Sequence, residues 1–347
     1  MSPSTVLGYA APAPGQPLEP FTYEAPDLED QEIRVSVTHC GVCFTDIHAI
    51  DDHFGVFSFP LLPGHEIVGR VTETGKAASG HEVGDLVGIG WQGRCCGGCE
   101  WCEAEQEHLC QEIPSCGTWT PYGGFASEVV VDGRFAYPLP AGMAAETAAV
   151  LMCAGIAVYP PLRLFATGPS CRVGIVGIGG LGHLAIQFAH ALGADVTALS
   201  SSPGKEVEAR RFGADHFVVS TDREAMAGIE YGFDLLICTA HGGIDWGTLL
   251  MSLRRTGRLV LVAFSPVHLE AAGGDGGAGP LVDLIAHELS ITGSFLGSRA
   301  DMREMLGFAQ EHGITPQVES MPMSRVNDAI RLVRENRARY RVVLVNE

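Results

Sequence analysis

Polar and apolar residues alternate along residues 32–38 (EIRVSVT), a pattern that predicts a half-buried β-strand. Short runs at residues 67–72 and after a turn at residues 84–88 predict two further strands. Glycine and proline separate these runs, and no repeat is visible. The first part of the chain is therefore predicted to be a small β-rich domain.

The pattern changes beyond about residue 154, where short apolar runs alternate with segments of helical periodicity. Strands are predicted at residues 173–177, 195–200, 216–220, 234–239, 258–264 and 289–295. Helices are predicted between them, notably at residues 206–212 and 246–254. Strands and helices in this alternation predict an α/β domain with a doubly wound parallel sheet.

A glycine-rich turn follows the first of these strands. The run RVGIV (172–176) leads directly into Gly177, Gly179 and Gly182, which have the spacing G-x-G-x-x-G. In the helix beyond, apolar residues recur at offsets of three and four: Leu181, Leu184, Ala185, Phe188, Ala189 and Leu192. Glycines let a pyrophosphate approach the backbone, and the helix N-terminus offers free N–H groups. The stretch therefore predicts a dinucleotide site, which includes Gly180 and Leu181.

The C-terminal sequence indicates a return to the first domain. Residues 302–310 and 325–335 are predicted helices, and residues 340–345 a closing strand. The dinucleotide-binding domain (154–295) would then be an insertion in a domain formed by residues 1–153 and 296–347. Residues 268–280 are predicted to form a flexible glycine-rich loop without a chemical signature.

Composition narrows the class of protein. The 347 residues carry a formal net charge of −19, which argues against nucleic acid as a partner because its phosphates would be repelled. The N-terminus lacks the basic and apolar regions of a signal peptide. No apolar run is expected to approach the ~20 residues that span a membrane, so no membrane partner is expected. We expect a cytoplasmic protein whose cysteines bind metal rather than form disulfides.

Four cysteines lie close together in the sequence: Cys96, Cys99, Cys102 and Cys110. Four thiolates can close a tetrahedral shell around one zinc ion and leave no position for substrate. The intervening residues are rich in glycine and charge, so the metal would supply the order of this lobe. A disulfide pair and an iron–sulfur cluster are the alternatives. Cys95 is interpreted as a bystander.

The end of the second predicted strand of the dinucleotide domain indicates the choice of cofactor. An NAD site places an acidic residue there to bind the ribose 2′-hydroxyl. This chain instead has Ser200, Ser201 and Ser202, followed by Lys205. Hydroxyls and an ammonium group favour a 2′-phosphate and hence NADP, although the serines alone also suit a turn.

Several motifs occur in one order along nearly the whole chain. They are GVCFTDIH (41–48), PGHEIVG (63–69), the four-cysteine lobe, LMCAGIAVY (151–159), VGIVGIGGLGHLAIQFA (173–189), ITGSFLGS (291–298) and RYRVV (339–343). With these motifs the chain resembles the zinc-dependent medium-chain alcohol dehydrogenases, and within them the cinnamyl alcohol dehydrogenase branch. The resemblance implies a β-rich GroES-like catalytic domain with an inserted Rossmann domain, and a homodimer.

The resemblance also implies a second, catalytic zinc ion bound by Cys43, His65 and Cys153. Two thiolates and one imidazole leave a fourth position open for substrate, and this Cys₂His set is the one known for alcohol dehydrogenases. Taken alone, a cysteine in an apolar stretch such as Cys153 is far more often a core residue than a ligand. Cys40 has the same ambiguity, and only the family's G-x-C pattern favours Cys43 over it. The resemblance makes Asp46 the partner that orients His65 and places Glu66 behind the metal.

The remaining site residues are likewise implied by the resemblance. Thr45 and His48 would relay the proton between the substrate oxygen and solvent, because a hydroxyl and an imidazole can each donate and accept a proton. Alternatively, Thr45 packs or caps a helix, and His48 is merely exposed. Ser294, Phe295 and Arg341 would contact the cofactor. Phe44 and Ala157 depart from the family pattern, which has His or Arg and Thr at these positions. Looser cofactor binding is therefore expected, unless Arg341, which the resemblance places near the pyrophosphate, compensates.

Together these features predict a zinc- and NADP-dependent enzyme that interconverts primary alcohols and aldehydes, aromatic or medium-chain aliphatic. One alternative is a reductase of conjugated C=C bonds on the same fold. A second, of another class, is a catalytically silent zinc-binding interaction protein that has kept the fold.

Overall fold

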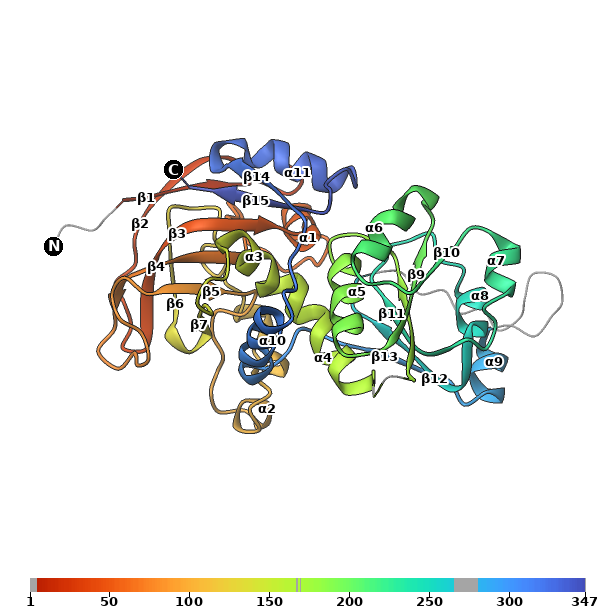
Figure 1. The fold of residues 1–347 in the computed structure, drawn as a ribbon. Coiled ribbons are helices and arrows are strands. Elements are labelled where there is room, and N and C mark those ends of the chain that lie inside the picture. Colours follow the sequence, from red (N-terminus) through yellow and green to blue (C-terminus); the bar gives the residue numbers. More distant parts are fainter. Residues whose placement is uncertain (1–4, 167, 169, 265–279, 347) are drawn as a thin grey trace. The chain divides into compact units, whose positions relative to one another are not determined.

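The computed structural model describes residues 5–166, 168, 170–264 and 280–346. The chain divides into two compact units, Met1–Ile156 with Gly297–Glu347, and Ala157–Leu296. In Figure 1 residues 297–347, at the blue end of the colour bar, belong to the same unit as the red and orange N-terminal elements. The glycine-rich stretch 268–280 lies outside the described residues except for Pro280, which begins a helix.

The second unit contains a parallel sheet of six strands in the order β10-β9-β8-β11-β12-β13. Relative to chain order this is 3-2-1-4-5-6, the order of dinucleotide-binding sheets. Its strands are β8 (Arg172–Val176), β9 (Asp195–Ser200), β10 (His216–Val219), β11 (Phe233–Cys238), β12 (Leu253–Leu261) and β13 (Ser290–Gly293). Its helices are α5 (Gly182–Ala191), α6 (Glu206–Arg211), α7 (Arg223–Ala227), α8 (Trp246–Met251) and α9 (Pro280–Ala286). The predicted doubly wound sheet is confirmed.

Two glycines of the β8–α5 turn are required by its geometry. Gly177 has a φ of 89°, which a side chain would disfavour, and a Cβ on Gly182 would lie 1.9 Å from the carbonyl oxygen of Gly177. The Thr239 hydroxyl donates to the carbonyl oxygens of Val176 and Gly177 at 3.0 and 2.9 Å. The turn is thereby fastened to the end of the neighbouring strand β11.

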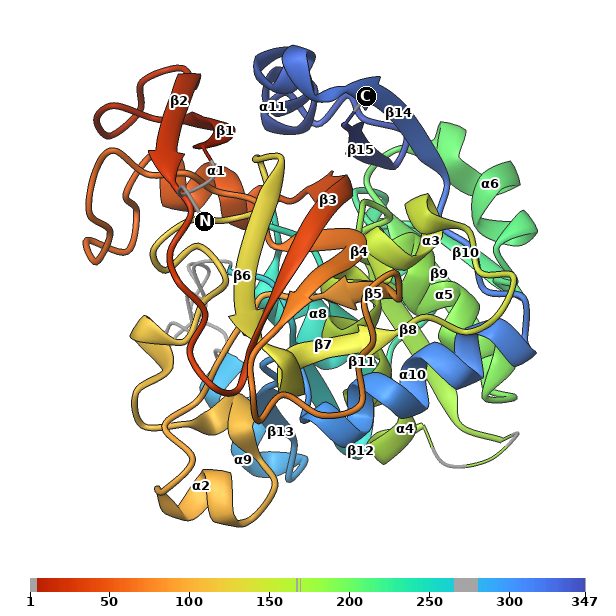
Figure 2. The same cartoon turned by 90° about the vertical axis from the view of Figure 1, so that its left-hand side faces the viewer.

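The first unit is built on a sheet of seven strands, in which β14-β15-β3-β4-β5-β7 are neighbours and β6 pairs with β3. The C-terminal strand β15 pairs antiparallel with β3 and parallel with β14. Figure 2 shows β6, β3 and β4 side by side, and the separate pair β1 and β2. The strands are β1 (Thr5–Ala10), β2 (Glu19–Glu24), β3 (Glu32–Val42), β4 (Glu66–Thr74), β5 (Leu86–Ile89), β6 (Glu128–Asp132), β7 (Ala136–Pro138), β14 (Val318–Pro322) and β15 (Arg341–Val345).

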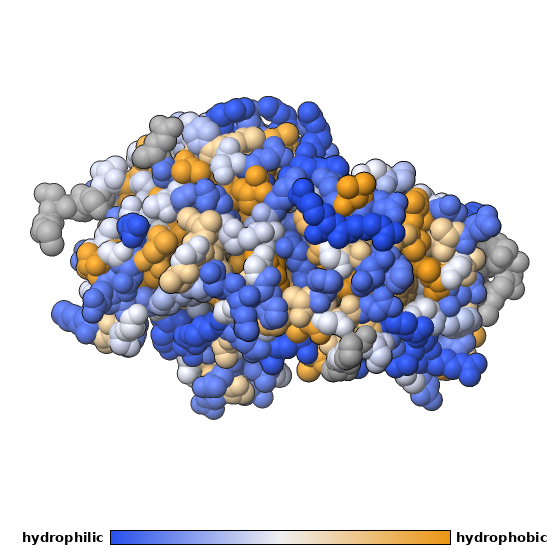
Figure 3. Space-filling view, in the orientation of Figure 1, coloured by the Kyte–Doolittle hydropathy of each residue, from blue (hydrophilic) through white to orange (hydrophobic). Residues whose placement is uncertain are grey.

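The helices of this unit are α1 (Phe44–Ile50), α2 (Glu100–Glu103), α3 (Ala145–Val150), α10 (Arg299–Glu311) and α11 (Val326–Arg334). The alternation seen in residues 32–38 follows the burial of β3, in which Ile33, Val35 and Val37 face the core. Hydrophilic residues predominate on the face of each unit drawn in Figure 3, with apolar residues scattered among them.

The expectation that no apolar run approaches membrane-spanning length was wrong. Residues 145–165 form one continuous helical segment of 21 residues, long and apolar enough to cross a membrane by length and composition. It comprises α3, a π-helical turn at Leu151–Gly155, and α4 (Ile156–Phe165), which contains Pro160 and Pro161. Because 78 % of its apolar window is buried inside the structure, the segment is a core helix.

The boundaries of one predicted helix were also wrong. α8 ends at Met251, and β12 already begins at Leu253, inside the stretch 246–254 predicted as helix. Leu253 pairs with Phe233 of β11, and Leu235 resumes the pairing at Arg258 after a register shift. Pairing with a neighbouring strand therefore overrides the local helical pattern.

Candidate active site

The predicted catalytic ligands meet in one buried cluster of the first unit. Cys43, His65, Glu66 and Cys153 each offer a ligand atom, and these atoms lie within 4.8 Å of one another. Cys43 follows β3 directly, whereas His65 and Glu66 stand at the start of β4, which pairs with β3. Cys153 comes from the π-helical turn, a feature common at functional sites. The sulfur atoms of Cys43 and Cys153 are 3.9 Å apart.

Asp46 organises two of these ligands. Its carboxylate accepts hydrogen bonds from the backbone N–H groups of Cys43 (2.9 Å) and Gly64 (3.0 Å). It lies 2.9 Å from Nδ1 of His65, and both side chains are fully buried. This contact fixes the imidazole so that Nε2 is the atom available to a metal.

Three observations show that the cluster fits a zinc ion. Nε2 of His65 is buried and has no hydrogen-bond partner among the described residues, which is costly unless a ligand occupies the position. A hydrogen bond from Cys153 holds the pKa of Cys43 well below its usual value against the opposing effect of burial, so Cys43 favours the thiolate form that zinc binds. Burial lowers the pKa of His65, but the Asp46 carboxylate raises it well above its usual value. The surroundings therefore favour a cation at this place.

Glu66, the fourth member of the cluster, forms a buried ion pair with Arg341. Burial raises the pKa of Glu66 to about 7, although the Arg341 guanidinium opposes the rise. Gly41 on β3 makes room for this carboxylate, because a Cβ there would lie 2.0 Å from Oε2 of Glu66. Arg341 was predicted as a cofactor contact, and its side chain faces Glu66; a role toward the cofactor stays a prediction.

Thr45 and His48 lie on α1, which begins directly after Cys43. The Thr45 hydroxyl oxygen is 3.5 Å from the Cys43 sulfur. His48 is three residues further, so that the two side chains share one side of the helix. The ring of Phe44, one of the departures from the family pattern, packs edge-on against His48 with centroids 5.1 Å apart.

Three aromatic residues beside the cluster were missed by the sequence analysis. The Trp119 ring is 5.1 Å from the ring of His65, and Phe57 and Trp91 pack on Trp119 with centroid distances of 5.3 and 6.1 Å. Trp119 is 4 % exposed. No sequence spacing connects these residues with the metal ligands. The only indication that they could lie at the site is the general enrichment of aromatic rings at ligand sites.

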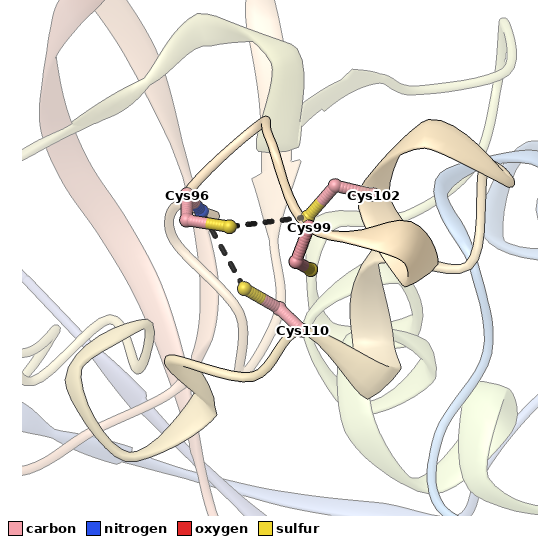
Figure 4. A group of neighbouring side chains, drawn as sticks. All are labelled: Cys96, Cys99, Cys102 and Cys110. Carbon is pink, nitrogen blue, oxygen red and sulfur yellow. Dashed lines mark hydrogen bonds between the residues drawn. The ribbon is translucent and has the colours of Figure 1, made fainter.

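The second cysteine cluster is formed by Cys96, Cys99, Cys102 and Cys110, whose sulfur atoms also lie within 4.8 Å of one another. Figure 4 shows the four thiols turned toward a common centre. The backbone N–H of Cys96 donates a hydrogen bond to the Cys110 sulfur at 3.5 Å, and the Cys96 and Cys102 sulfurs are 3.8 Å apart. Backbone hydrogen bonds from Gln111 and Cys102 lower the pKa of Cys99 to about 6, which favours a thiolate. All 11 cysteines are free thiols in the structure, so the lobe contains no disulfide. No residue of α2 is buried, which leaves the metal to order the lobe.

Among the predicted cofactor residues of the second unit, Lys205 reaches the β8–α5 turn. Lys205 donates a hydrogen bond of 2.6 Å to the carbonyl oxygen of Ile178 within the glycine motif. Ser200 ends β9, is buried, and accepts from the backbone N–H of Ser202 at 3.1 Å. Ser294 and Phe295 follow β13, and Phe295 is exposed.

A Cys₂His cluster in one unit and a dinucleotide-binding sheet in the other define a zinc-binding dehydrogenase. The family model "Alcohol dehydrogenase GroES-like domain" matches residues 29–141, and "Zinc-binding dehydrogenase" matches residues 180–311. A probable cinnamyl alcohol dehydrogenase 1 of Nicotiana tabacum is 38 % identical, over 98 % of this chain and 95 % of the relative. The aldehyde reductase AdhA of Synechocystis sp. is 37 % identical, over 98 % of both chains.

Solved structures agree with these relatives. A cinnamyl alcohol dehydrogenase of Sorghum bicolor has a TM-score of 0.89 and 35 % identity, over 99 % of this chain and 98 % of that chain. The CAD of Helicobacter pylori complexed with NADP(H) has a TM-score of 0.88 and 25 % identity, with the same coverage. The chain belongs to the medium-chain alcohol dehydrogenase and aldehyde reductase family. It is an enzyme of alcohol and aldehyde oxidoreduction.

Proposed function

We propose that this enzyme interconverts primary alcohols and aldehydes of aromatic or medium-chain aliphatic type, with zinc and NADP(H) as cofactors. The observation that carries the proposal is the buried set Cys43, His65 and Cys153, with Nε2 of His65 directed into it and lacking a partner among the described residues. Two thiolates and one imidazole bind zinc and leave a position open for a substrate oxygen. The relatives named as cinnamyl alcohol dehydrogenases support the substrate class.

Zinc, when bound, polarises the carbonyl group as a Lewis acid, and the nicotinamide supplies or accepts the hydride. The protein contributes the placement of groups and the path of the proton. Asp46 holds His65 in position, and Thr45 exchanges the proton with the substrate oxygen because its hydroxyl both donates and accepts. His48 then passes the proton toward solvent. Trp119, Trp91 and Phe57 give this side of the cluster an apolar wall that suits an aryl or alkyl group.

The proposal is tested by following NADPH oxidation with a panel of aldehydes that includes cinnamaldehyde and medium-chain aliphatic aldehydes. We expect turnover with several of them and the corresponding alcohols as products. Product analysis separates this function from the C=C reductase, which would convert cinnamaldehyde into the saturated aldehyde. Absence of turnover with every aldehyde by a protein that contains zinc would contradict the proposal.

The preference for NADP is supported by the residues at the end of β9. Ser200, Ser201 and Ser202 replace the acidic residue of an NAD site, and Lys205 lies against the glycine motif. The relative from Helicobacter pylori, which was solved with NADP(H), agrees with this preference.

We expect Lys205→Ala to weaken the use of NADPH about ten-fold or more, because a charge-assisted hydrogen bond contributes roughly 1.5–3 kcal/mol. Ser200→Asp should act in the same direction through repulsion of the 2′-phosphate and should improve the use of NADH. The measurement is kcat/KM for each cofactor. NADH is the internal control, since a damaged glycine turn would impair both cofactors alike. Equal kinetics with NADPH and NADH in the unmodified enzyme would refute the assignment.

Two expectations about the assembled protein stay predictions. The resemblance to the family predicts a homodimer, and the composition predicts a cytoplasmic location. Neither is needed for the chemistry described above, since the catalytic cluster is formed within one unit of one chain.

A further inference from the structure

His183 lies in the first turn of α5, directly after Gly182, the last glycine of the dinucleotide motif. Its side chain is fully buried, and its ring packs edge-on against the ring of Phe212, with centroids 5.5 Å apart. Nδ1 of the ring lies 3.0 Å from the carbonyl oxygen of Gly179. A carbonyl oxygen only accepts, so Nδ1 donates in this hydrogen bond. The backbone N–H of His183 donates to the same oxygen at 3.2 Å.

The hydrogen bond from the ring fixes the orientation of the peptide unit between Gly179 and Gly180. A peptide bond is planar and trans, so the Gly180 N–H points away from the Gly179 carbonyl oxygen. A donor that holds the oxygen therefore also sets the direction of the N–H. Glycine has no side chain to restrict this peptide unit, so an anchor from outside the turn has to restrict it. A Cβ on Gly179 would meet no atom of the described residues within 4 Å, so the turn is open on that side.

The neighbouring carbonyl oxygens of the turn are bound by side chains as well. Thr239 donates to the carbonyl oxygen of Gly177, and Lys205 donates to that of Ile178. The proposed function assigns the Lys205 ammonium group to the 2′-phosphate, which leaves Thr239 and His183 as the fixed anchors of the turn. Because the carbonyl oxygens are held by these groups, the trans peptide units turn their N–H groups the opposite way. Successive N–H groups in this arrangement bind an anion.

We propose that His183 is a positioning residue for the cofactor. Its Nδ1–H holds the Gly179 carbonyl oxygen, so that the Gly180 N–H is directed at the pyrophosphate. The inference rests on the proposed binding of a nicotinamide dinucleotide at the glycine motif and adds a residue that shapes this motif. Because NADPH and NADH share the pyrophosphate, the contribution of His183 is the same for both and independent of the 2′-phosphate. The imidazole touches no reacting atom and acts only through the backbone of the turn.

Two substitutions separate the hydrogen bond from the packing of the ring. His183→Phe keeps an aromatic ring against Phe212 but removes the donor. His183→Asn removes most of the ring but keeps a donor, because the amide nitrogen of asparagine can take the place of Nδ1. We expect His183→Phe to raise the dissociation constants of NADPH and NADH by the same factor, about five-fold, as loss of one hydrogen bond predicts. His183→Asn should stay within about two-fold of the unmodified protein, because the hydrogen bond is kept.

Isothermal titration calorimetry with three ligands tests these expectations. NADPH and NADH carry the pyrophosphate, whereas 2′-AMP carries the 2′-phosphate and no pyrophosphate. His183→Phe should leave the dissociation constant of 2′-AMP unchanged, and Lys205→Ala should raise it. The control is His190→Gln, which changes an exposed histidine on the same helix and should bind all three ligands like the unmodified protein. In steady-state kinetics, the loss in His183→Phe should appear in KM for the cofactor, and kcat at saturating NADPH should not fall.

The tautomer of His183 provides a second test that needs no substitution. The hydrogen bond to Gly179 requires a proton on Nδ1, and NMR of the imidazole nitrogens distinguishes this state from a ring protonated on Nε2 alone. We expect Nδ1 to carry a proton both without ligand and with NADPH bound.

Unchanged dissociation constants of both cofactors in His183→Phe would overturn the inference. So would an equal loss in His183→Asn, which would assign the effect to packing, or a parallel loss for 2′-AMP, which would indicate general damage. A ring protonated on Nε2 alone would overturn it even if His183→Phe does not fold. Tighter binding of NADH than of NADPH by the unmodified protein would refute the proposed cofactor preference, but the role of His183 would stand.

Discussion

Cys153→Ala is expected to lower turnover at least ~10³-fold while the protein stays folded. The zinc ion contributes several kcal/mol of transition-state stabilisation as a Lewis acid, and each 1.36 kcal/mol corresponds to a factor of ten. Without Cys153, one thiolate and one imidazole are left to hold the ion, and occupancy should fall. The fold should survive because alanine is compatible with the helical segment in which Cys153 lies. Steady-state kinetics and metal analysis on the same samples measure both effects.

Cys238→Ala is the matched control for this experiment. Cys238 is also buried, on β11 of the other unit, and burial raises the pKa of its thiol. We expect this variant to keep two zinc ions per chain and full turnover, whereas Cys153→Ala should keep one. Normal activity of Cys153→Ala would mean that the catalytic ligands are assigned wrongly and that Cys153 is a core residue.

The strands of the parallel sheet could be predicted because their sequence is dominated by burial. In β8, every residue after Arg172 is buried, and such strands appear as continuous apolar runs. The short strands β1, β2, β6, β7 and β14 were missed. β2 lies in a two-stranded sheet and buries no residue, and β7 has only three residues, so neither gives a hydrophobic period that can be recognised.

Long-range pairing explains what could not be predicted at the site. Glu66 and Arg341 are 275 residues apart in the chain, and their pairing follows from the sheet that brings β15 to β3 and β3 to β4. The resemblance to the family suggested both residues, but no local pattern indicates that they meet. Likewise, no spacing connects Trp119 with His65.

Phe44 departs from the family pattern, and the structure shows which residue its ring contacts. The sequence predicts looser cofactor binding, because phenylalanine cannot replace a charged contact to the pyrophosphate. In the structure the ring packs against His48 and helps to hold it.

Cys99→Ala is expected to destabilise the protein rather than to impair the chemistry directly. Structural zinc ions contribute about 10 kcal/mol or more to the folding of small domains. Loss of one of the four ligands should lower the free energy of unfolding by several kcal/mol. For a unit of this size, this corresponds to a decrease in Tm of at least ~10 °C. The reason lies in the lobe itself, where α2 buries no side chain and no disulfide is present. Differential scanning calorimetry with metal analysis measures the effect.

Cys95→Ala separates the metal from general damage to the same lobe. Cys95 is the neighbour of Cys96 in the chain and is partly buried, but it lies outside the group of four sulfur atoms. We expect the Cys95→Ala variant to retain two zinc ions and a Tm close to that of the unmodified protein. Cys99→Ala molecules that remain folded should retain the catalytic zinc and much of their turnover at low temperature, because Cys43, His65 and Cys153 are unchanged. A Cys99→Ala protein with two zinc ions and an unchanged Tm would show that these four cysteines do not form a structural metal site.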